Sequence, residues 1–169
     1  AQLPPKPEYK KALQRVTAQL VSGMNRAGGY TYKLSQASTA PRIGNFDNSN
    51  SQYGLLGVWA GAEFGIETPN NYWTVSNQFW RSLQCKDGGW DYHQPGNSTL
   101  SMTAAGVASL YVCQEYMQEP LRLESKEDAA MDRGLARLHA STLTASGAIV
   151  GTPQFMSPEQ AEGRRVDAR

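Results

Sequence analysis

The side chains of Cys85, His93 and Cys113 in this 169-residue sequence are of types that bind zinc or act as nucleophiles. A protein zinc site needs three or four converging ligands at about 2.0–2.3 Å. Cys85 and His93 flank an expected turn, whereas Cys113 falls late in an expected helix, and this spacing predicts no convergence. We therefore expect no metal and no other cofactor, with Cys113 interpreted as a buried structural cysteine and His93 as a surface histidine.

Two clusters of polar residues stand where helices are expected to begin. Free N–H groups at a helix N-terminus, together with hydroxyl groups, can hold a polar or anionic small molecule or a peptide. The alternative is that these side chains only cap the helices, since Ser, Thr, Asn and Asp are the preferred caps. The first cluster contains Asp47, Asn48, Asn50 and Gln52, and the second contains Thr99 and Thr103.

Hydroxyl side chains are also frequent after residue 140. Thr142, Thr144 and Thr152 are candidate phosphoacceptors there, because phosphate on such a segment can recruit clusters of Arg. The alternative interpretation is a solvated linker rich in Ser and Thr.

The composition narrows the class of protein. Sixteen Lys and Arg against fifteen Asp and Glu give a net charge of +1, which argues against a dedicated nucleic-acid binder. The sequence has no apolar run of about 18 residues, so we expect no membrane span and a soluble protein. The chain starts at Ala1 without a leader, which predicts a processed product or an excised piece and leaves a secreted or periplasmic origin open.

The elements that position these side chains come from an internal repeat. Residues 28–30 (Gly-Gly-Tyr) recur as residues 88–90 (Gly-Gly-Trp). Each copy follows an amphipathic helix, at about 8–23 and 72–83, and precedes a second helix rich in small apolar residues. The first of the amphipathic helices has an apolar stripe of Leu13, Val16, Leu20 and Val21. The unit is therefore an outer helix, a turn and an inner helix.

A third copy begins and then breaks off. Residues 124–128 are acidic and favour a helix N-terminus, and apolar positions continue to Leu138. The composition changes near residue 140. We predict a linker or mature N-terminus over 1–7, a repeat domain over 8–139 with two hairpins and the first helix of a third, and an irregular tail over 140–169.

The second copy resembles the QW motif of the prenyltransferase/squalene-oxidase repeat, in the terpenoid-cyclase superfamily. Phe79, Trp80, Gln84, Gly88 and Trp90 carry the likeness over about residues 8–139. The first copy is degenerate, with Met24 and Tyr30 at the Gln and Trp positions. The resemblance implies an all-α fold in which hairpins form part of an α/α toroid. An incomplete toroid has an open apolar edge, which predicts self-association.

The motif predicts a structural role, in which its residues close the end of the outer helix. The glycine pairs Gly28-Gly29 and Gly88-Gly89 permit a positive-φ turn that ends each outer helix. Gln84 can bond free backbone groups at the helix end, while Trp90, like Tyr30 in the first copy, covers that end and excludes water.

The superfamily includes enzymes, but this sequence lacks their motifs. Squalene-type cyclases use Asp-x-Asp-Asp as an acid, whereas no two aspartates are adjacent here. Prenyltransferase β subunits use Asp, Cys and His as zinc ligands. The spacing of Cys85, His93 and Cys113 in this sequence does not predict such a site. The aspartates are Asp47, Asp87, Asp91, Asp128, Asp132 and Asp167.

The tail resembles the activation segment of bacterial Ser/Thr protein kinases. Residues 151–160 read Gly-Thr-Pro-Gln-Phe-Met-Ser-Pro-Glu-Gln, with Ser157-Pro158-Glu159 in the place of Ala-Pro-Glu. The likeness covers about residues 141–169. Phosphoryl transfer also needs a phosphate-covering Gly loop, a strand Lys, a His-Arg-Asp loop and an Asp-Phe-Gly ligand, none of which we identify.

We therefore expect a non-catalytic structural or binding module fused to an orphan kinase-like segment. One alternative is a fragment of a terpenoid-cyclase or prenyltransferase-like enzyme. Another is a tail that acts as a phosphorylatable regulatory peptide. The junction itself has three explanations that stay open at this stage: an artificial joining of two gene pieces, a natural fusion, and a chance likeness.

Overall fold

The computed structural model describes residues 7–32, 46–117 and 128–144. All regular elements in these ranges are helices, so the all-α prediction is confirmed. Residues 1–6 of the predicted linker and 145–169 of the predicted tail lie outside the described residues. The helices are α1 (Pro7–Gly23), α2 (Asn48–Glu63), α3 (Asn70–Ser82), α4 (Leu100–Tyr116) and α5 (Ala129–Thr144).

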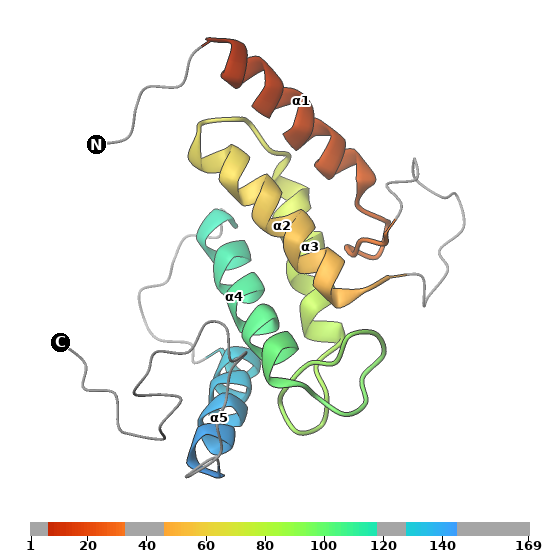
Figure 1. Cartoon of the computed structure of the whole chain (residues 1–169), viewed down its shortest axis with the longest axis vertical. Helices are drawn as coiled ribbons and strands as arrows, with labels where there is room; N and C mark the ends of the chain where they lie inside the picture. Colours follow the sequence, from red (N-terminus) through yellow and green to blue (C-terminus); the bar gives the residue numbers. More distant parts are fainter. Residues whose placement is uncertain (1–6, 33–45, 118–127, 145–169) are drawn as a thin grey trace, which may run out of the picture.

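In Figure 1, α1, α2, α4 and α5 follow one another from top to bottom, and α3 lies behind α2 and α4. α1 packs on α2, α3 packs on α4, and α4 also packs on α2 and on α5. α2 and α4 therefore occupy the inner positions expected of helices that are apolar over most of their circumference. The two helix pairs, α1–α2 and α3–α4, are followed by α5, which packs on α4. Within the described residues, no helix is long and apolar enough to cross a membrane.

The core is built around three tryptophans. Trp73, Trp80 and Trp90 are buried, together with Leu55 and Leu110 from the two inner helices. Phe79 packs edge-on against Trp80, with ring centroids 5.8 Å apart. These contacts join both hairpins into one hydrophobic core, because the tryptophans come from α3 and its turn while Leu55 comes from α2.

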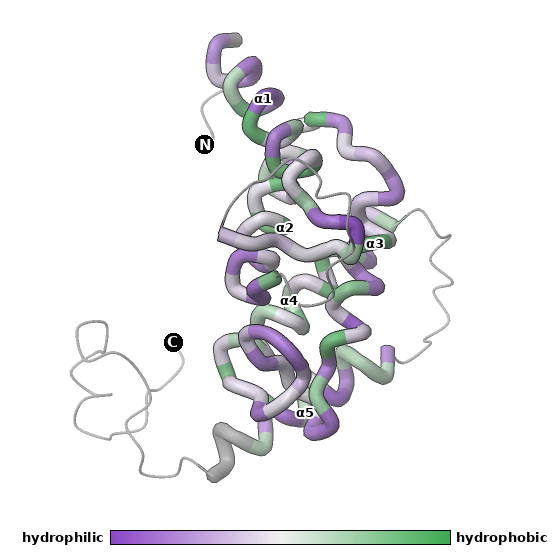
Figure 2. Tube along the Cα trace, turned by 90° about the vertical axis from the view of Figure 1, so that its right-hand side faces the viewer, coloured by the Kyte–Doolittle hydropathy of each residue, from purple (hydrophilic) through white to green (hydrophobic). Residues whose placement is uncertain are grey.

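The apolar stripe predicted for α1 is wrong at one position. Val16 is 45% exposed, and Thr17 is buried in its place. Thr17 faces Gly61 of α2, where the missing side chain lets the two helices approach closely. Leu13, Leu20 and Val21 are half-buried as an amphipathic outer helix requires. In Figure 2, hydrophobic and hydrophilic stretches alternate along α1.

α1 begins at Pro7, the last residue of the predicted linker. Proline is suited to the first helical position, because its missing N–H would have no helical partner there. A helix N-terminus is predicted over residues 124–128; α5 begins at Ala129, directly after Asp128, and residues 124–127 lie outside the described residues.

Trp90→Ala is expected to lower the free energy of unfolding by about 3–5 kcal/mol, since it truncates a fully buried aromatic side chain. Urea denaturation monitored by circular dichroism measures this change. Tyr111→Ala serves as the control, because Tyr111 is 61% exposed and its loss should cost less than about 0.5 kcal/mol. Equal stability losses in the two variants would contradict the role given to Trp90.

Candidate functional site

The second Gly-Gly-aromatic turn is closed by a set of short hydrogen bonds. Cys85 N–H donates to Gly89 O at 2.8 Å, and Gly88 N–H donates to Cys85 O at 3.0 Å. The indole Nε1 of Trp90 donates to Trp80 O at 2.8 Å, which satisfies a carbonyl near the end of α3. Trp90 N–H donates to the Thr103 hydroxyl at 3.2 Å, so the turn is tied to the inner helix α4.

The first turn has the same construction. Asn25 N–H donates to Gly29 O at 2.9 Å, and Gly28 N–H donates to Asn25 O at 3.0 Å. The Tyr30 hydroxyl donates to Leu20 O at 2.9 Å, and Tyr30 N–H donates to the Ser51 hydroxyl at 2.9 Å. Tyr30 and Ser51 thus do in the first hairpin what Trp90 and Thr103 do in the second.

Each turn also packs against the outer helix that follows it. Gly28 (φ 101°) and Gly88 (φ 86°) have positive φ, which suits glycine. A Cβ on Gly28 would lie 2.6 Å from Val75 O of α3, and a Cβ on Gly88 would lie 2.7 Å from Arg133 O of α5. α5 therefore bears the same relation to the second turn as α3 bears to the first.

Gln84 links the second turn to α5. Its Nε2 donates to Gly88 O at 2.8 Å and to Ala130 O at 2.7 Å, and Arg133 donates to its Oε1. Met24 occupies the matching position of the first hairpin and has no amide with which to make these bonds. The first turn reaches the next outer helix through another polar contact, the hydrogen bond of 3.0 Å between the hydroxyl groups of Tyr30 and Tyr72 of α3.

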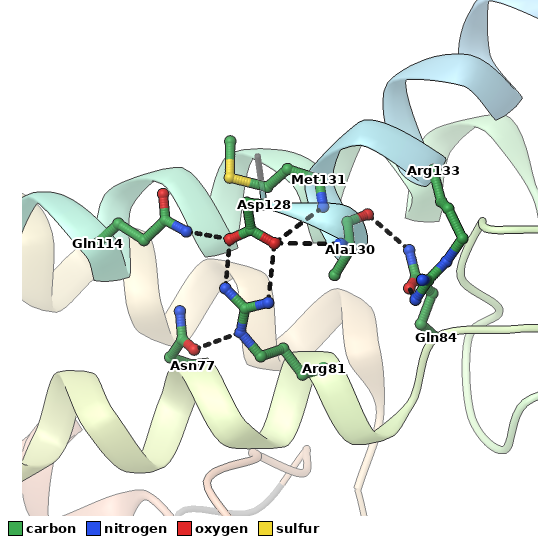
Figure 3. Close-up of polar contacts among 8 residues, drawn as sticks. All are labelled: Asn77, Arg81, Gln84, Gln114, Asp128, Ala130, Met131 and Arg133. Carbon is green, nitrogen blue, oxygen red and sulfur yellow. Dashed lines mark hydrogen bonds and ion pairs between the residues drawn. The ribbon is translucent and has the colours of Figure 1, made fainter. Parts of the chain in front are cut away.

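A polar cluster between α3, α4 and α5 centres on Asp128 (Figure 3). Its carboxylate accepts two hydrogen bonds from the Arg81 guanidinium, one of them at 2.8 Å, and another from Gln114 of α4. It also accepts from Ala130 N–H and Met131 N–H, as a helix N-cap does. The hydrogen bonds from Arg81 lower the pKa of Asp128 against the opposing effect of partial burial.

Further contacts hold α5 along its length. Arg137 Nε donates to Asp87 Oδ2 and to Ser98 Oγ, each at 3.1 Å. Gly134 lies so close to the core that a Cβ there would be 2.6 Å from Val107 and 3.0 Å from the Trp90 ring. The helix is therefore fixed at its start by Asp128, in its middle by Gly134 and farther along by Arg137.

The first predicted cluster at the inner-helix mouth is engaged in capping α2. Asp47 Oδ1 accepts from Asn50 N–H at 2.9 Å and also from the Ser49 hydroxyl. Burial raises the pKa of Asp47, but hydrogen bonds from Ser49 and Asn50 and the nearby His93 outweigh burial and leave it below its usual value. Gln52 is half-buried in the first turn of α2.

The second predicted cluster caps α4 and lies beside the first. Thr99 Oγ1 accepts from Met102 N–H at 3.2 Å, and the Thr103 hydroxyl donates to Thr99 O at 2.7 Å. Asn48 binds the segment between the second turn and the second cluster, since its Nδ2 donates to Asp91 O and its N–H donates to Tyr92 O, each at 2.7 Å. The structure thus shows helix capping in both predicted clusters.

The residues considered for metal chemistry do not converge. Among the described residues, no group of three His, Cys, Asp or Glu side chains could hold a metal ion. Cys85 and Cys113 are buried free thiols. Burial raises the pKa of Cys113 to about 12, so this thiol stays protonated near neutral pH, where a metal ligand or nucleophile would need the thiolate.

No family model matches the chain, and no solved structure matches it. Several curated bacterial Ser/Thr protein kinases do match part of it. Serine/threonine-protein kinase pkn3 of Myxococcus xanthus is 41% identical over 61 residues, covering 33% of this chain and 11% of the kinase. The probable kinase PkwA of Thermomonospora curvata is 33% identical over 79 residues, covering 42% and 11%. PknB of Mycolicibacterium smegmatis is 50% identical over 50 residues, covering 27% and 8%.

The chain thus spans about a tenth of the length of these relatives. The resemblance to bacterial Ser/Thr kinases is confirmed for a segment of the chain. No comparison supports the prenyltransferase/squalene-oxidase resemblance. These matched segments of 61, 79 and 50 residues are each longer than the predicted tail over 140–169.

α5 contains a motif that the sequence-based predictions above do not include. Asp132-Arg133-Gly134 stands upstream of Ser157-Pro158-Glu159, as Asp-Phe-Gly stands upstream of Ala-Pro-Glu in kinases. The substitution of Arg for Phe hid it, and the spacing to Pro158 was the signal that could have revealed it. Thr142 and Thr144 lie in the last turn of α5, and Thr152 lies outside the described residues.

Gly88→Ala is expected to destabilise the protein by about 2–4 kcal/mol, because positive φ and a clash with Arg133 O act together. Gly65→Ala is the matched control. Gly65 also has positive φ, 74°, but a Cβ there would meet nothing within 4 Å, so only the backbone cost of about 1–2 kcal/mol remains. Thermal and urea denaturation measure both variants, and equal losses would refute the proposed packing of the turn on α5.

Asp128→Asn is expected to cost about 1 kcal/mol at neutral pH, since one partner of a partly exposed charged pair is lost. A carboxylate whose folded pKa is lowered stabilises the fold above its unfolded pKa, near 3.9, and loses this effect as the pH falls through the folded value. The unfolding free energy of Asp128→Asn should therefore decrease less steeply below about pH 4 than that of the wild type. Arg81→Gln should flatten the same part of the curve, and an unchanged slope in both variants would contradict the assignment.

Proposed function

We propose that this chain is a non-catalytic structural or binding module of the prenyltransferase/squalene-oxidase repeat type, joined to a kinase-like segment that transfers no phosphate itself. The observation that carries the proposal is the placement of Asp132-Arg133-Gly134 within α5. Gly134 packs on Trp90 and Val107 of the helical stack, so this segment serves as the outer helix of a third repeat.

The chemistry of the segment supports the same conclusion. In kinases, the Asp of Asp-Phe-Gly holds magnesium against the nucleotide phosphates, and the Phe sets the active or inactive state by its packing. Here Asp132 is exposed on α5, and Arg133, at the Phe position, is hydrogen-bonded to Gln84. The surroundings of Asp132 and Arg133 are thus those of a helix packed on other helices rather than those of a nucleotide-binding site.

The internal repeat supports the module. Tyr30 and Trp90 close equivalent turns, and a Cβ on Gly54 would lie 2.7 Å from the Tyr30 ring. A Cβ on Gly106 would lie 2.4 Å from the Trp90 ring. Such matched packing is what a repeat of stacked hairpins needs to bury its faces. These aromatic and glycine residues stabilise the fold. We therefore expect a ligand to bind at the ends of the helices.

A second candidate function is favoured by the kinase likeness. In this hypothesis the segment is the substrate of a bacterial Ser/Thr kinase, because activation segments carry phosphorylation sites between Asp-Phe-Gly and Ala-Pro-Glu. Thr144 and Thr152 fall in that interval. Phosphate there would add about two negative charges to a segment whose sequence also contains Arg164, Arg165 and Arg169.

Incubation of the purified chain with ATP and magnesium is expected to give no phosphorylated product. Addition of an active bacterial Ser/Thr kinase should phosphorylate Thr144 or Thr152, as identified by tandem mass spectrometry. Thr144→Ala and Thr152→Ala should together remove most of the signal, whereas Thr68→Ala, outside the kinase-like segment, should leave it unchanged. Phosphate transfer by the chain alone would overturn the non-catalytic proposal, and no phosphorylation by the added kinase would remove the second candidate.

A further inference from the structure

A cavity of about 280 Å³ lies at the opposite ends of α2 and α4 from the predicted mouth. It is open to solvent and is lined by residues from the end of α2, the α2–α3 connection, the start of α3 and the last turn of α4. Its volume is close to the lower limit for small-molecule sites, so it suits a ligand of few atoms. The lining residues used below are Ala62, Ile66, Glu67, Thr68, Trp73 and Tyr116.

One wall of the cavity is aromatic. The rings of Trp73 and Tyr116 are stacked, with centroids 4.7 Å apart and planes inclined by 25°. Trp73 is buried, while Tyr116 is half-buried and lies closer to solvent. Ile66 and Ala62 extend the apolar surface. Aromatic rings attract cations through their negatively charged faces, so this wall can hold an apolar chain that carries a positive charge.

The charges around the cavity are negative. Glu67 lines it, and Glu63 accepts a hydrogen bond from the Tyr116 hydroxyl. Burial together with the charges of Glu63 and Glu115 raises the pKa of Tyr116 to about 12. Both carboxylates therefore add negative charge beside the Tyr116 hydroxyl. No basic side chain is among the lining residues that the structure describes.

The helix C-termini at the cavity also favour a positively charged ligand. α2 ends at Glu63 and α4 ends at Tyr116, so two helix C-termini, which favour cations, meet at the cavity. The N-terminus of α3 at Asn70 opposes them. Two C-termini and the carboxylates of Glu63, Glu67 and Glu115 thus stand against one N-terminus. The Thr68 hydroxyl is buried without a hydrogen-bond partner among the described residues, and a ligand donor reaching it would relieve that cost.

We propose that this cavity binds a small organic cation, an ammonium group on a short apolar chain. The chain would lie against Tyr116 and Ile66, and the ammonium group would face Glu67. The source is a free amine or a lysine side chain of another protein, since both present this chemistry. The proposal deepens the binding role proposed above, and its test reads the cavity directly, so its failure leaves the phosphorylation experiment unaffected.

The test is an NMR titration of the full chain with n-butylammonium, followed at the backbone amides of Ile66 and Thr68 and at the Trp73 indole. n-Butanol and butyrate, titrated at the same ionic strength, are the neutral and anionic controls. We expect saturable shifts with butylammonium and weaker or no shifts with the controls. Equal binding of butanol, tighter binding of butyrate, or no binding of the cation would overturn the proposal.

Two variants place the binding in the cavity. Glu67→Gln should weaken butylammonium binding about fivefold, the value of one exposed charge pair. Asp132→Asn removes the same charge from exposed α5 and should leave the affinity unchanged. Ala62→Leu should fill the cavity and abolish binding while keeping a helix-forming residue in α2. Unchanged affinity in Glu67→Gln would overturn the proposal even if Ala62→Leu did not fold.

A second titration separates the two sources. N-acetyl-lysine methylamide presents the same ammonium group on a peptide backbone. Tighter binding of this compound than of butylammonium would support a lysine of a protein partner, and the reverse order would support a free amine. Both results require the sensitivity to Glu67→Gln to persist, and its loss would count against the site.

Discussion

The close approach of each Gly-Gly turn to the next outer helix is the constraint on which the rest of the structure depends. Gly28 leaves no room for a side chain against Val75 O, and Gly88 leaves none against Arg133 O. Positive φ at both positions turns the chain from the outer to the inner helix. The same few residues therefore end one helix, place an aromatic ring in the core and fix the position of the following hairpin.

Trp90 shows how this constraint propagates through the stack. Its indole N–H satisfies Trp80 O on α3, and its ring lies against Gly106 of α4 and Gly134 of α5. One side chain thus contacts three helices. Asp128 adds the polar part of the same junction, because it caps α5 while binding Arg81 of α3. The kinase-like sequence of α5 is held by the packing surfaces of the repeat, which supports a structural role for it here.

The sequence predicted the helical class and the internal repeat, because helical periodicity and Gly-Gly turns are local signals. It did not predict the exposure of Val16, since that depends on Gly61 in a distant helix offering room to Thr17. Asp132-Arg133-Gly134 was missed because one substitution disguised it. The cavity beside Tyr116 was missed for another reason, since it forms only where two helix ends and a connection meet.

The central claim is that α5 belongs to the helical stack although its sequence resembles a kinase segment. Hydrogen exchange with mass spectrometry tests this claim most directly, because protection reports the stability of each helix separately. If α5 is the third outer helix, the amides from Met131 to Leu138 should exchange about as slowly as those of α3 and α4. Rapid exchange of these amides while α3 and α4 stay protected would contradict the account.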